Sequence, residues 1–159
     1  MRGIIKKQSK KDSVNQKEDE KHVKGKIMKE QKYKMGQAYW VYLGRQEGSV
    51  QGGWHPAIIV QNNIGNKFSR TISVVPTTSR KTKAKLPTHV MIQGGKFGFS
   101  RDSIVQCEGQ RPVDKSDIGG YIGTVDDQTM GEIARACLIN TPFLLFLDGN
   151  YDFEGAVAC

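Results

Sequence analysis

The sequence predicts a small, mainly β domain that ends in one helix, an α+β fold preceded by a basic extension. Short runs rich in β-branched and aromatic residues recur between turn residues from position 37 to 125, which is typical of strands. One pattern with helical spacing follows them at 126–140. The chain has 159 residues, and about 110–120 residues are enough to bury a core that folds without disulfides.

Three strands are expected in the first half of this domain. Residues 37–43 alternate aromatic and aliphatic side chains. Pro56 leads into an apolar run that predicts a buried strand over 57–61, and the β-branched segment 71–76 ends at a proline, which is expected to close the third strand. Between these last two strands, the polar cluster Gln61-Asn62-Asn63 is followed by Gly65-Asn66, a pair that predicts a turn.

The second half is expected to complete a series of about five to seven short strands. Residues 88–92 and 103–107 each have the composition of a strand, and a loop rich in glycine separates them. Residues 111–113 and 121–125 favour two further short strands, with a helical turn at 117–118 between them. Such a series, with helix mainly at its end, indicates a compact β-barrel with a terminal helix.

The terminal helix is expected to start at Asp126-Asp127, because acidic residues cap a helix and suit its macrodipole there. Pro142 is expected to end it near Asn140. The apolar residues 143–147 then pack on the core or meet a partner. Five residues have the spacing of a stripe that faces the core: Met130, Ile133, Ala134, Cys137 and Leu138.

The net charge of +8 is concentrated at the start of the chain. Residues 1–34 hold 12 Lys and Arg against 5 Asp and Glu, a balance of +7, which leaves +1 for the rest. This segment has few aliphatic side chains to bury, so it is expected to be disordered or a frayed helix. The alternative is an arm whose lysines add salt-sensitive affinity for a nucleic acid.

The cysteines and the hydropathy exclude several classes of protein. Cys107, Cys137 and Cys159 are odd in number and lack the spacing of a metal site, so reduced thiols and no metal are expected. The N-terminus lacks the apolar stretch of a signal peptide, and the run 143–147 is too short to cross a bilayer. These features predict a cytoplasmic protein that does not bind a membrane.

A glycine-rich stretch before the second strand, Gly48-Ser49-Val50-Gln51-Gly52-Gly53-Trp54-His55-Pro56, suits a loop whose backbone approaches a polar ligand. Further motifs follow it in order: Asn66-Lys67-Phe68-Ser69, Thr77-Thr78-Ser79, Lys83-Ala84-Lys85-Leu86-Pro87-Thr88-His89-Val90, Phe97-Gly98-Phe99-Ser100-Arg101-Asp102-Ser103 and Arg111-Pro112-Val113-Asp114-Lys115. Taken together, these motifs resemble the MazF/PemK family of toxin endoribonucleases. The resemblance runs from Lys34 to Leu147.

The resemblance implies an SH3-like barrel of the MazF/PemK/CcdB kind, usually a homodimer. It assigns 35–147 to the toxin domain, between the extension 1–34 and a loose tail at 148–159. It implies the toxin of a type II toxin–antitoxin system, which cleaves single-stranded mRNA at a short sequence. The reaction would use attack by the 2′-hydroxyl on the adjacent phosphate, without metal or cofactor. The expected partners are single-stranded RNA and a MazE-like antitoxin.

Two catalytic positions follow from the resemblance. The family threonine maps to Thr78, whose hydroxyl can donate to a phosphate oxygen. The family arginine maps to His55, and this departure changes the chemistry available. Histidine has an ordinary pKa of about 6.5, so it holds an anion less well at neutral pH but transfers protons better. His55 is therefore expected either to take over proton transfer, or to leave the enzyme weakened or inactive.

The remaining site residues are assigned to RNA binding. Trp54 either stacks on a base or closes the end of the barrel, and Glu108 either bonds a base or is structural. His89 lies in a strand-like context and is expected to be a satisfied core histidine. The loop residues able to contact phosphate or base edges are Ser49, Gln51, Gly52 and Gly53. The basic run expected to follow the RNA backbone, or else to form only a solvated loop, is Arg80, Lys81, Lys83 and Lys85.

Two alternative functions have different sequence signals. A non-catalytic relative that binds RNA or antitoxin fits the exchange of arginine for His55. A CcdB-like gyrase poison shares the expected barrel, but such toxins act through their C-terminal end, and the intact glycine loop with Thr78 favours the ribonuclease.

Overall fold

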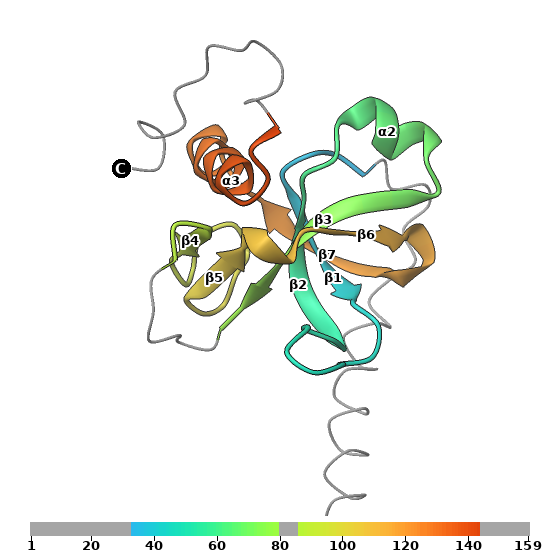
Figure 1. Ribbon diagram of the computed structural model, residues 1–159, viewed down its shortest axis with the longest axis horizontal. Helices are drawn as coiled ribbons and strands as arrows, with labels where there is room; N and C mark the ends of the chain where they lie inside the picture. The colour runs from blue at the N-terminus through green and yellow to red at the C-terminus, as the bar shows by residue number, and fades with distance from the viewer. Residues whose placement is uncertain (1–32, 80–85, 144–159) are drawn as a thin grey trace, which may run out of the picture.

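The computed structural model describes residues 33–79 and 86–143, and within these ranges the chain forms one curved sheet with an α-helix packed on it (Figure 1). The helical elements are α2 (Asn63–Phe68), α3 (Asp127–Asn140) and two short 3-10 helices, η1 (Cys107–Gly109) and η2 (Lys115–Asp117). The seven strands are β1 (Gln37–Tyr42), β2 (Trp54–Ile59), β3 (Thr71–Thr78), β4 (His89–Ile92), β5 (Ser103–Gln106), β6 (Arg111–Asp114) and β7 (Ile118–Thr124).

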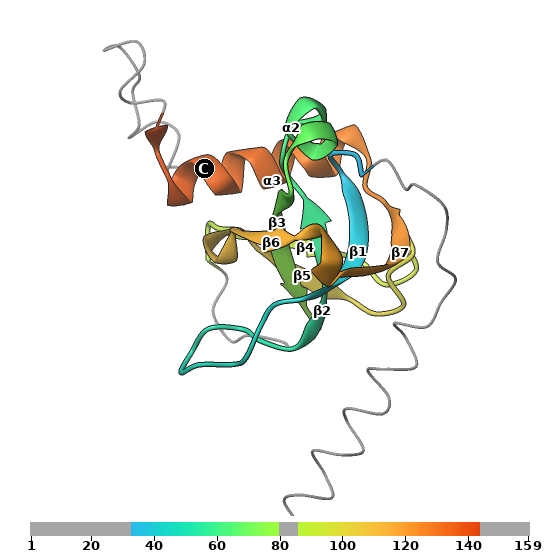
Figure 2. The ribbon, with the colours of Figure 1, turned by 90° about the vertical axis from the view of Figure 1, so that its right-hand side faces the viewer.

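The sheet is organised around β3. The strand order is β4-β5-β3-β2-β1-β7, with β6 paired to β3 outside this path, and every pair is antiparallel. The first half of β3 pairs with β6 and its middle with β2, whereas its last residues, Thr77 and Thr78, pair with β5. Because one strand changes partners along its length, the sheet curls around itself as a barrel does (Figure 2).

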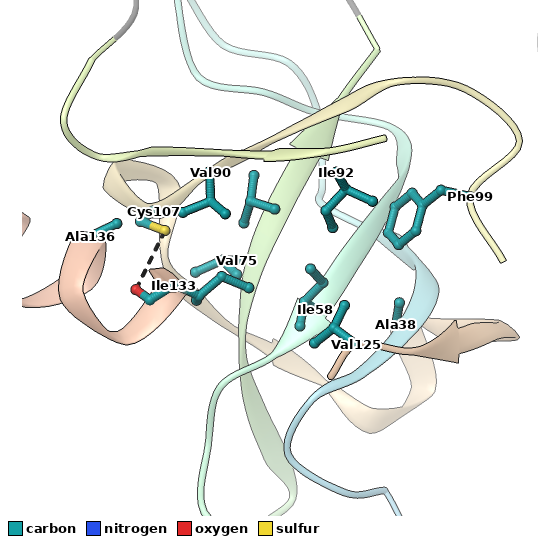
Figure 3. Packing of buried hydrophobic residues seen from close by; sticks show 11 residues of the cluster. Ala38, Ile58, Val75, Val90, Ile92, Phe99, Cys107, Val125, Ile133 and Ala136 are labelled. Atoms are coloured by element: carbon teal, nitrogen blue, oxygen red, sulfur yellow. Dashed lines mark hydrogen bonds between the residues drawn. The ribbon is translucent and has the colours of Figure 1, made fainter. Parts of the chain in front are cut away.

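Both faces of the central strands are buried. Ile58 and Val75 belong to a cluster that includes Phe99 of the β4–β5 loop and, from α3, Ile133 (Figure 3). Ile59 and Val74 belong to a second cluster. Strands buried on both faces carry continuous apolar runs rather than alternation. This is why the fully buried segments 57–59 and 74–76 carry no polar side chain.

The helix α3 begins and ends where the sequence predicted. The Asp126 side chain accepts from the backbone N–H of Thr129 at 2.8 Å, and the helix stops at Asn140 before Pro142. The predicted stripe was partly wrong, because Ala134 and Leu138 are exposed and Ala136 is buried instead. Three of its five residues were correct: Ile133 is buried, and Met130 and Cys137 pack against the same cluster.

Cys107 joins α3 to the sheet. Its thiol is buried and lies 3.8 Å from the carbonyl oxygen of Ile133 (Figure 3). A hydrogen bond with the Cys137 thiol, together with burial, raises the pKa of Cys107 above its ordinary value. Cys107 and Cys137 are free thiols, in agreement with the sequence prediction, whereas Cys159 lies outside the described residues.

The turn predicted at Gly65-Asn66 is wrong, because residues 63–68 form the helix α2. Asn62 caps it by accepting from the N–H of Gly65 at 2.8 Å, and the Asn66 amide is buried and donates to the Gln61 carbonyl. Asparagine side chains here satisfy helix termini rather than close a turn. The sequence therefore identified the polar residues correctly but assigned them the wrong backbone conformation.

Two strands extend beyond their predicted limits. β2 begins at Trp54, so His55 is a strand residue rather than a loop residue, and β3 continues through Pro76 to Thr78. Proline did not end β3 because the strand leaves β2 there and pairs with β5 from Thr77 onward. Elsewhere the boundaries shift by a few residues: β7 begins at Ile118, inside the predicted helical turn, and Cys107 belongs to η1.

The β1–β2 loop extends from the end of the molecule that lies away from α3 (Figures 1 and 2). The extension 1–32 and the residues after 143, for which disorder and a loose tail were predicted, lie outside the described part of the chain. Among the helices of the described residues, none has the length and apolar character needed to span a membrane.

Candidate functional site

A cleft of about 660 Å³ lies where β1, the start of β2, the end of β3, the β4–β5 loop and β7 meet. His55 and Thr78, the two residues expected to be catalytic, both line it. They come from neighbouring strands of the sheet, 23 positions apart in the sequence. The fold thus brings together the two positions that the sequence singled out.

His55 is held by both ring nitrogens. It lies in β2 opposite Val41 of β1, so its backbone is fixed in the sheet. Nδ1 lies 2.7 Å from the Gln51 amide nitrogen, and Nε2 lies 2.9 Å from the Gly52 carbonyl oxygen. An amide nitrogen only donates, so Nδ1 accepts, and Nε2 carries the proton that it donates to Gly52. The geometry therefore selects a neutral ring protonated on Nε2.

Gln51 points into the protein rather than towards solvent. Its amide nitrogen also donates to the Thr77 carbonyl at 3.0 Å, so one side chain joins the loop, β2 and β3. Its Oε1 atom is buried and has no hydrogen-bond partner within the described residues. A buried amide oxygen without a partner is costly, which is a common property of functional sites.

Arg111 connects the β1–β2 loop to η1 through two hydrogen bonds. Its Nη1 donates to the Gln51 carbonyl at 3.0 Å, and its Nε donates to the Gly109 carbonyl at 3.2 Å. The guanidinium thus bridges the loop and η1, which directly precedes β6. The backbone of Gln51 is held from this side while its side chain holds His55.

The glycines of the loop are required by its backbone. Gly53 has a φ of 79° and forms backbone hydrogen bonds with Gly44 and Leu43, and a Cβ on Gly52 would overlap the backbone of Gln46. These contacts explain the Gly-Gly pair as a structural need, while its predicted role in RNA binding stays a prediction. Ser49 is exposed and lines a second hollow rather than the cleft of His55.

The two threonines at the end of β3 differ in their surroundings. Thr77 is 1% exposed, and its hydroxyl donates to the Pro56 carbonyl at 2.9 Å. Thr78 is partly exposed and lines the cleft. This difference is consistent with a structural role for Thr77 and a functional role for Thr78.

Aromatic side chains form one wall of the cleft. Trp54, Trp40 and Tyr121 line it, and Trp54 packs against Tyr42 with ring centroids 5.6 Å apart. Trp54 also packs over Gly119 of β7, where an added Cβ would lie 3.1 Å from its ring. Trp54 therefore closes this end of the sheet and lines the cleft at the same time. Such rings can stack on an unpaired base.

The sequence reasoning gave no role to Arg101, which also lines the cleft. It lies in the β4–β5 loop, and its side chain is exposed. The signal available in the sequence was a single arginine within the motif Phe97 to Ser103, directly before a strand. The loop comes close to His55 only through tertiary structure, so local pattern did not reveal it.

Glu108 and His89 form a pair away from the His55 cleft. His89 Nε2 lies 2.8 Å from Glu108 Oε1, and the His89 side chain is 8% exposed. The predicted satisfied histidine thus has its partner. Glu108 also lines the second hollow, of about 510 Å³, together with Ser49, Gln51 and Arg111. Gln51 lines this second hollow, while its side chain bonds His55 of the first cleft and its carbonyl accepts from Arg111.

The basic run Arg80, Lys81, Lys83 and Lys85 lies outside the described residues. Within 33–79 and 86–143, no group of three or more His, Cys, Asp or Glu is arranged to hold a metal ion. The cleft offers imidazole, hydroxyl, guanidinium and aromatic groups. These are the groups that bind a phosphodiester and transfer protons.

Comparison with known proteins agrees with this geometry. The family of PemK-like, MazF-like toxins of type II toxin–antitoxin systems matches residues 34–140. The endoribonuclease EndoA of Bacillus subtilis (strain 168) is 40% identical over 113 residues, which cover 71% of this chain and 97% of that protein. The endoribonuclease MazF of Staphylococcus saprophyticus is 39% identical over 101 residues, covering 64% and 84%.

Solved structures share the fold. An endoribonuclease from Mycobacterial species, in complex with its cognate antitoxin, is 26% identical with a TM-score of 0.57, covering 69% of this chain and 95% of that one. MazF from Deinococcus radiodurans has a TM-score of 0.60 at 21% identity, covering 69% and 96%. The barrel and terminal helix expected from the sequence are confirmed. The chain belongs to the family of PemK-like, MazF-like toxins of type II toxin–antitoxin systems.

Proposed function

We propose that this protein is an active, metal-independent endoribonuclease that cleaves single-stranded mRNA at a short sequence. The observation that carries the proposal is the placement of His55 and Thr78, the counterparts of the two family catalytic residues, in one cleft. The match over 34–140 supports assigning this activity to a domain of residues 35–147.

The roles follow from the groups present. The substrate 2′-hydroxyl attacks the adjacent phosphorus, and the bond to the 5′-oxygen breaks, leaving a 2′,3′-cyclic phosphate and a 5′-hydroxyl. His55 is the proton-transfer residue: once Nδ1 has taken up a proton from solvent, the imidazolium can turn its Nε2–H from the Gly52 carbonyl to the departing oxygen and protonate it, while the 2′-hydroxyl proton goes to solvent. The Thr78 hydroxyl donates to a non-bridging oxygen. Trp54, supported by Trp40 and Tyr121, stacks on a base.

The competing function is a relative that binds RNA without cutting it. The two ring contacts of His55 favour this alternative, since a ring held by Gln51 and Gly52 must release one of them to meet the substrate. An arginine at the same position would carry five donors and would not depend on that release. The two functions therefore differ in whether His55 takes part in the reaction.

The decisive experiment is cleavage of a mixed-sequence single-stranded RNA in EDTA from about pH 5.5 to 8.5, a range that spans histidine titration. Wild type is compared with His55→Ala, His55→Arg and Thr78→Ala. We expect metal-free cutting by wild type and a loss of about 10²–10⁴-fold in rate for His55→Ala. A pH dependence present in wild type and absent from His55→Arg would assign the proton transfer to His55.

Other results would select the alternatives. RNA binding without product by wild type, with cutting by His55→Arg, would identify a binding relative whose chemistry has been lost. Inhibition of DNA supercoiling by gyrase without RNA cutting would instead favour a CcdB-like poison. If no variant cuts any sequence context, the ribonuclease function is rejected.

The partners are part of the same proposal. A related mycobacterial endoribonuclease was solved with its cognate antitoxin, which supports a MazE-like antitoxin for this chain. We expect the antitoxin to cover the RNA cleft, so that adding it abolishes cutting, and a complex that still cuts RNA would contradict this. A homodimer is expected from the family, to be tested by sedimentation, and a cytoplasmic location by cell fractionation.

A further inference from the structure

Arg101 is the candidate for a catalytic role that neither the sequence motifs nor the family resemblance assigned. Arg101 lines the same cleft as His55 and Thr78. Among the lining residues that the structure describes, Arg101 alone carries a permanent positive charge. No ion pair involves its guanidinium within residues 33–79 and 86–143, so it is available to a ligand.

The cleft needs such a charge. A phosphodiester is anionic, and negative charge builds up on its non-bridging oxygens as the 2′-oxygen attacks. His55 is held as a neutral ring by Gln51 and Gly52, and Thr78 offers only a neutral hydroxyl. Neither supplies a fixed cation, whereas a guanidinium does so at every pH in the assay range.

The backbone that carries Arg101 is fixed on both sides. Before it, the Gly95 N–H donates to the Phe99 carbonyl across the β4–β5 loop at 2.7 Å, and Phe99 is buried in the core. After it, the buried Ser103 hydroxyl donates to the Arg101 carbonyl at 3.0 Å. These contacts hold the Arg101 backbone beside the cleft before the substrate arrives, and such preorganisation favours electrostatic catalysis.

The loop also stores backbone strain next to β7. Phe97 has a φ of 52°, which is unusual for a residue other than glycine, and Gly98 has a φ of 82°. A Cβ on Gly98 would overlap the Ile122 carbonyl, so the loop lies directly against β7. Strained conformations persist only where the surrounding structure over-determines them, and they cluster at functional sites. Here Phe97 lies four residues before Arg101 in the same loop.

We propose that Arg101 is a catalytic residue that binds the non-bridging oxygens of the scissile phosphate and stabilises the charge of the transition state. This deepens the proposed ribonuclease function and rests on it. Arg101 neither gains nor loses a proton: the 2′-hydroxyl proton goes to solvent, and His55, after taking up a solvent proton at Nδ1, gives its Nε2 proton to the departing 5′-oxygen. Arg101, in the β4–β5 loop, thus supplies the positive charge that the family arginine supplies from the position of His55 in β2.

The test compares two RNAs with one cleavage site, one natural and one with sulfur in place of the 5′-bridging oxygen. A thiolate leaves without being protonated, so this substrate removes the need for an acid but not for a cation at the phosphate. We expect His55→Ala to be slow on natural RNA and largely restored on the sulfur substrate. Arg101→Gln is expected to be about 10²–10³-fold slow in kcat on both.

Matched variants separate this role from others. Arg135→Gln removes an exposed arginine of α3 and is expected to cut at the wild-type rate, while Arg101→Lys is expected to retain part of the activity. Circular dichroism melting confirms that each variant folds. A higher KM at unchanged kcat for Arg101→Gln would mean that Arg101 only attracts RNA, and would overturn the catalytic assignment.

The experiment distinguishes a wrong role for Arg101 from a wrong assignment of ribonuclease activity. If wild type cuts RNA and Arg101→Gln cuts equally fast, Arg101 is not catalytic but the ribonuclease function stands. If wild type cuts neither substrate, the proposed function and the role of Arg101 fall together.

Discussion

The amide nitrogen of Gln51 lies 2.7 Å from Nδ1 of His55, and this contact decides which ring nitrogen carries the proton. The same amide donates to the Thr77 carbonyl, so it cannot turn its oxygen towards the ring without losing that bond. Gln51 was predicted to contact RNA, and its side chain instead faces His55. The RNA contact predicted for Gln51 stays a prediction, and it is now expected of the loop backbone rather than of this side chain.

Replacing Gln51 is expected to change the tautomer of His55. In wild type above neutral pH, nitrogen NMR of the imidazole ring should show a proton on Nε2 and none on Nδ1. In Gln51→Glu, a carboxylate that only accepts lies at the same position, so Nδ1 should become protonated. The chain has three histidines, and the loss of one signal in His55→Gln identifies the ring.

A control variant separates the amide from mere packing. Gln51→Met keeps the size of the side chain but has no donor, so it should leave a mixture of tautomers. Finding Nδ1 protonated in wild type would contradict this assignment of the ring.

The Thr77 hydroxyl is expected to stabilise the junction of β2 and β3. Thr77→Val removes the donor to the Pro56 carbonyl and leaves that oxygen buried without its bond, at a cost of about 1–3 kcal/mol in the free energy of unfolding. Thr77→Ser keeps the hydroxyl and should be less destabilised. Urea unfolding of both variants measures the difference, and equal stabilities would rule out the hydrogen bond as the cause.

Two Gly→Ala exchanges should have opposite effects on stability. Gly98→Ala places a Cβ against the Ile122 carbonyl at a φ of 82°, so it should be strongly destabilising. Gly131→Ala, within α3, has no atom within 4 Å of the new Cβ, and alanine should stabilise the helix by about 0.5–1 kcal/mol. Thermal melts compare the two, and a Gly98→Ala protein as stable as wild type would mean that the loop moves freely from β7.

Alkaline pH is expected to lower the stability of the protein through Tyr39. Burial, and then the charges of the neighbouring Tyr33 and Tyr121, raise the pKa of Tyr39 from 10.0 to about 12. A raised pKa in the folded state means that its contribution to stability is complete below pH 10 and is lost as pH rises through 12. Urea unfolding across this range should show the decline.

Tyr39→Phe is the control for this titration. It should weaken the decline in stability between pH 10 and 12, because the group that ionises is gone. It also removes the hydrogen bond from the Tyr39 hydroxyl to Gln37, at a cost of about 1 kcal/mol at neutral pH. An unchanged decline would assign the alkaline transition to another group.

The elements that could be predicted are those whose signal is local. Alternation identified β1, and the capping aspartate and the following proline identified the ends of α3. The apolar run after Pro56 identified β2, but its start at Trp54 depends on pairing with β1, which a local pattern does not contain. The same limit applies to β3, whose last two residues follow Pro76 because they pair with β5.

The errors in the helices have the same origin. Helical spacing from Met130 allows two adjacent faces, and only the position of the sheet selects the one that buries Ala136 rather than Ala134. A Gly-Asn pair favours a turn in isolation, but the Asn66 amide bonds the Gln61 carbonyl and stabilises α2. In both cases tertiary contacts overrode a local preference.

The site was predictable only where motifs marked it. His55 and Thr78 were found through the family pattern, and the structure places both in the cleft. Arg101 was missed because its loop meets β2 and β3 only through the closed sheet. Likewise, no sequence pattern showed that Gln51 faces inward or that Arg111 holds the loop.

The pairing of the first strand with the last has a consequence for synthesis. β1 pairs with β7, and Thr77 and Thr78 pair with β5, so the cleft cannot assemble until most of the domain has left the ribosome. A nascent chain therefore has no complete site while its own message is being read. Because the sheet closes late, we expect the site to form only when translation of the chain is nearly finished.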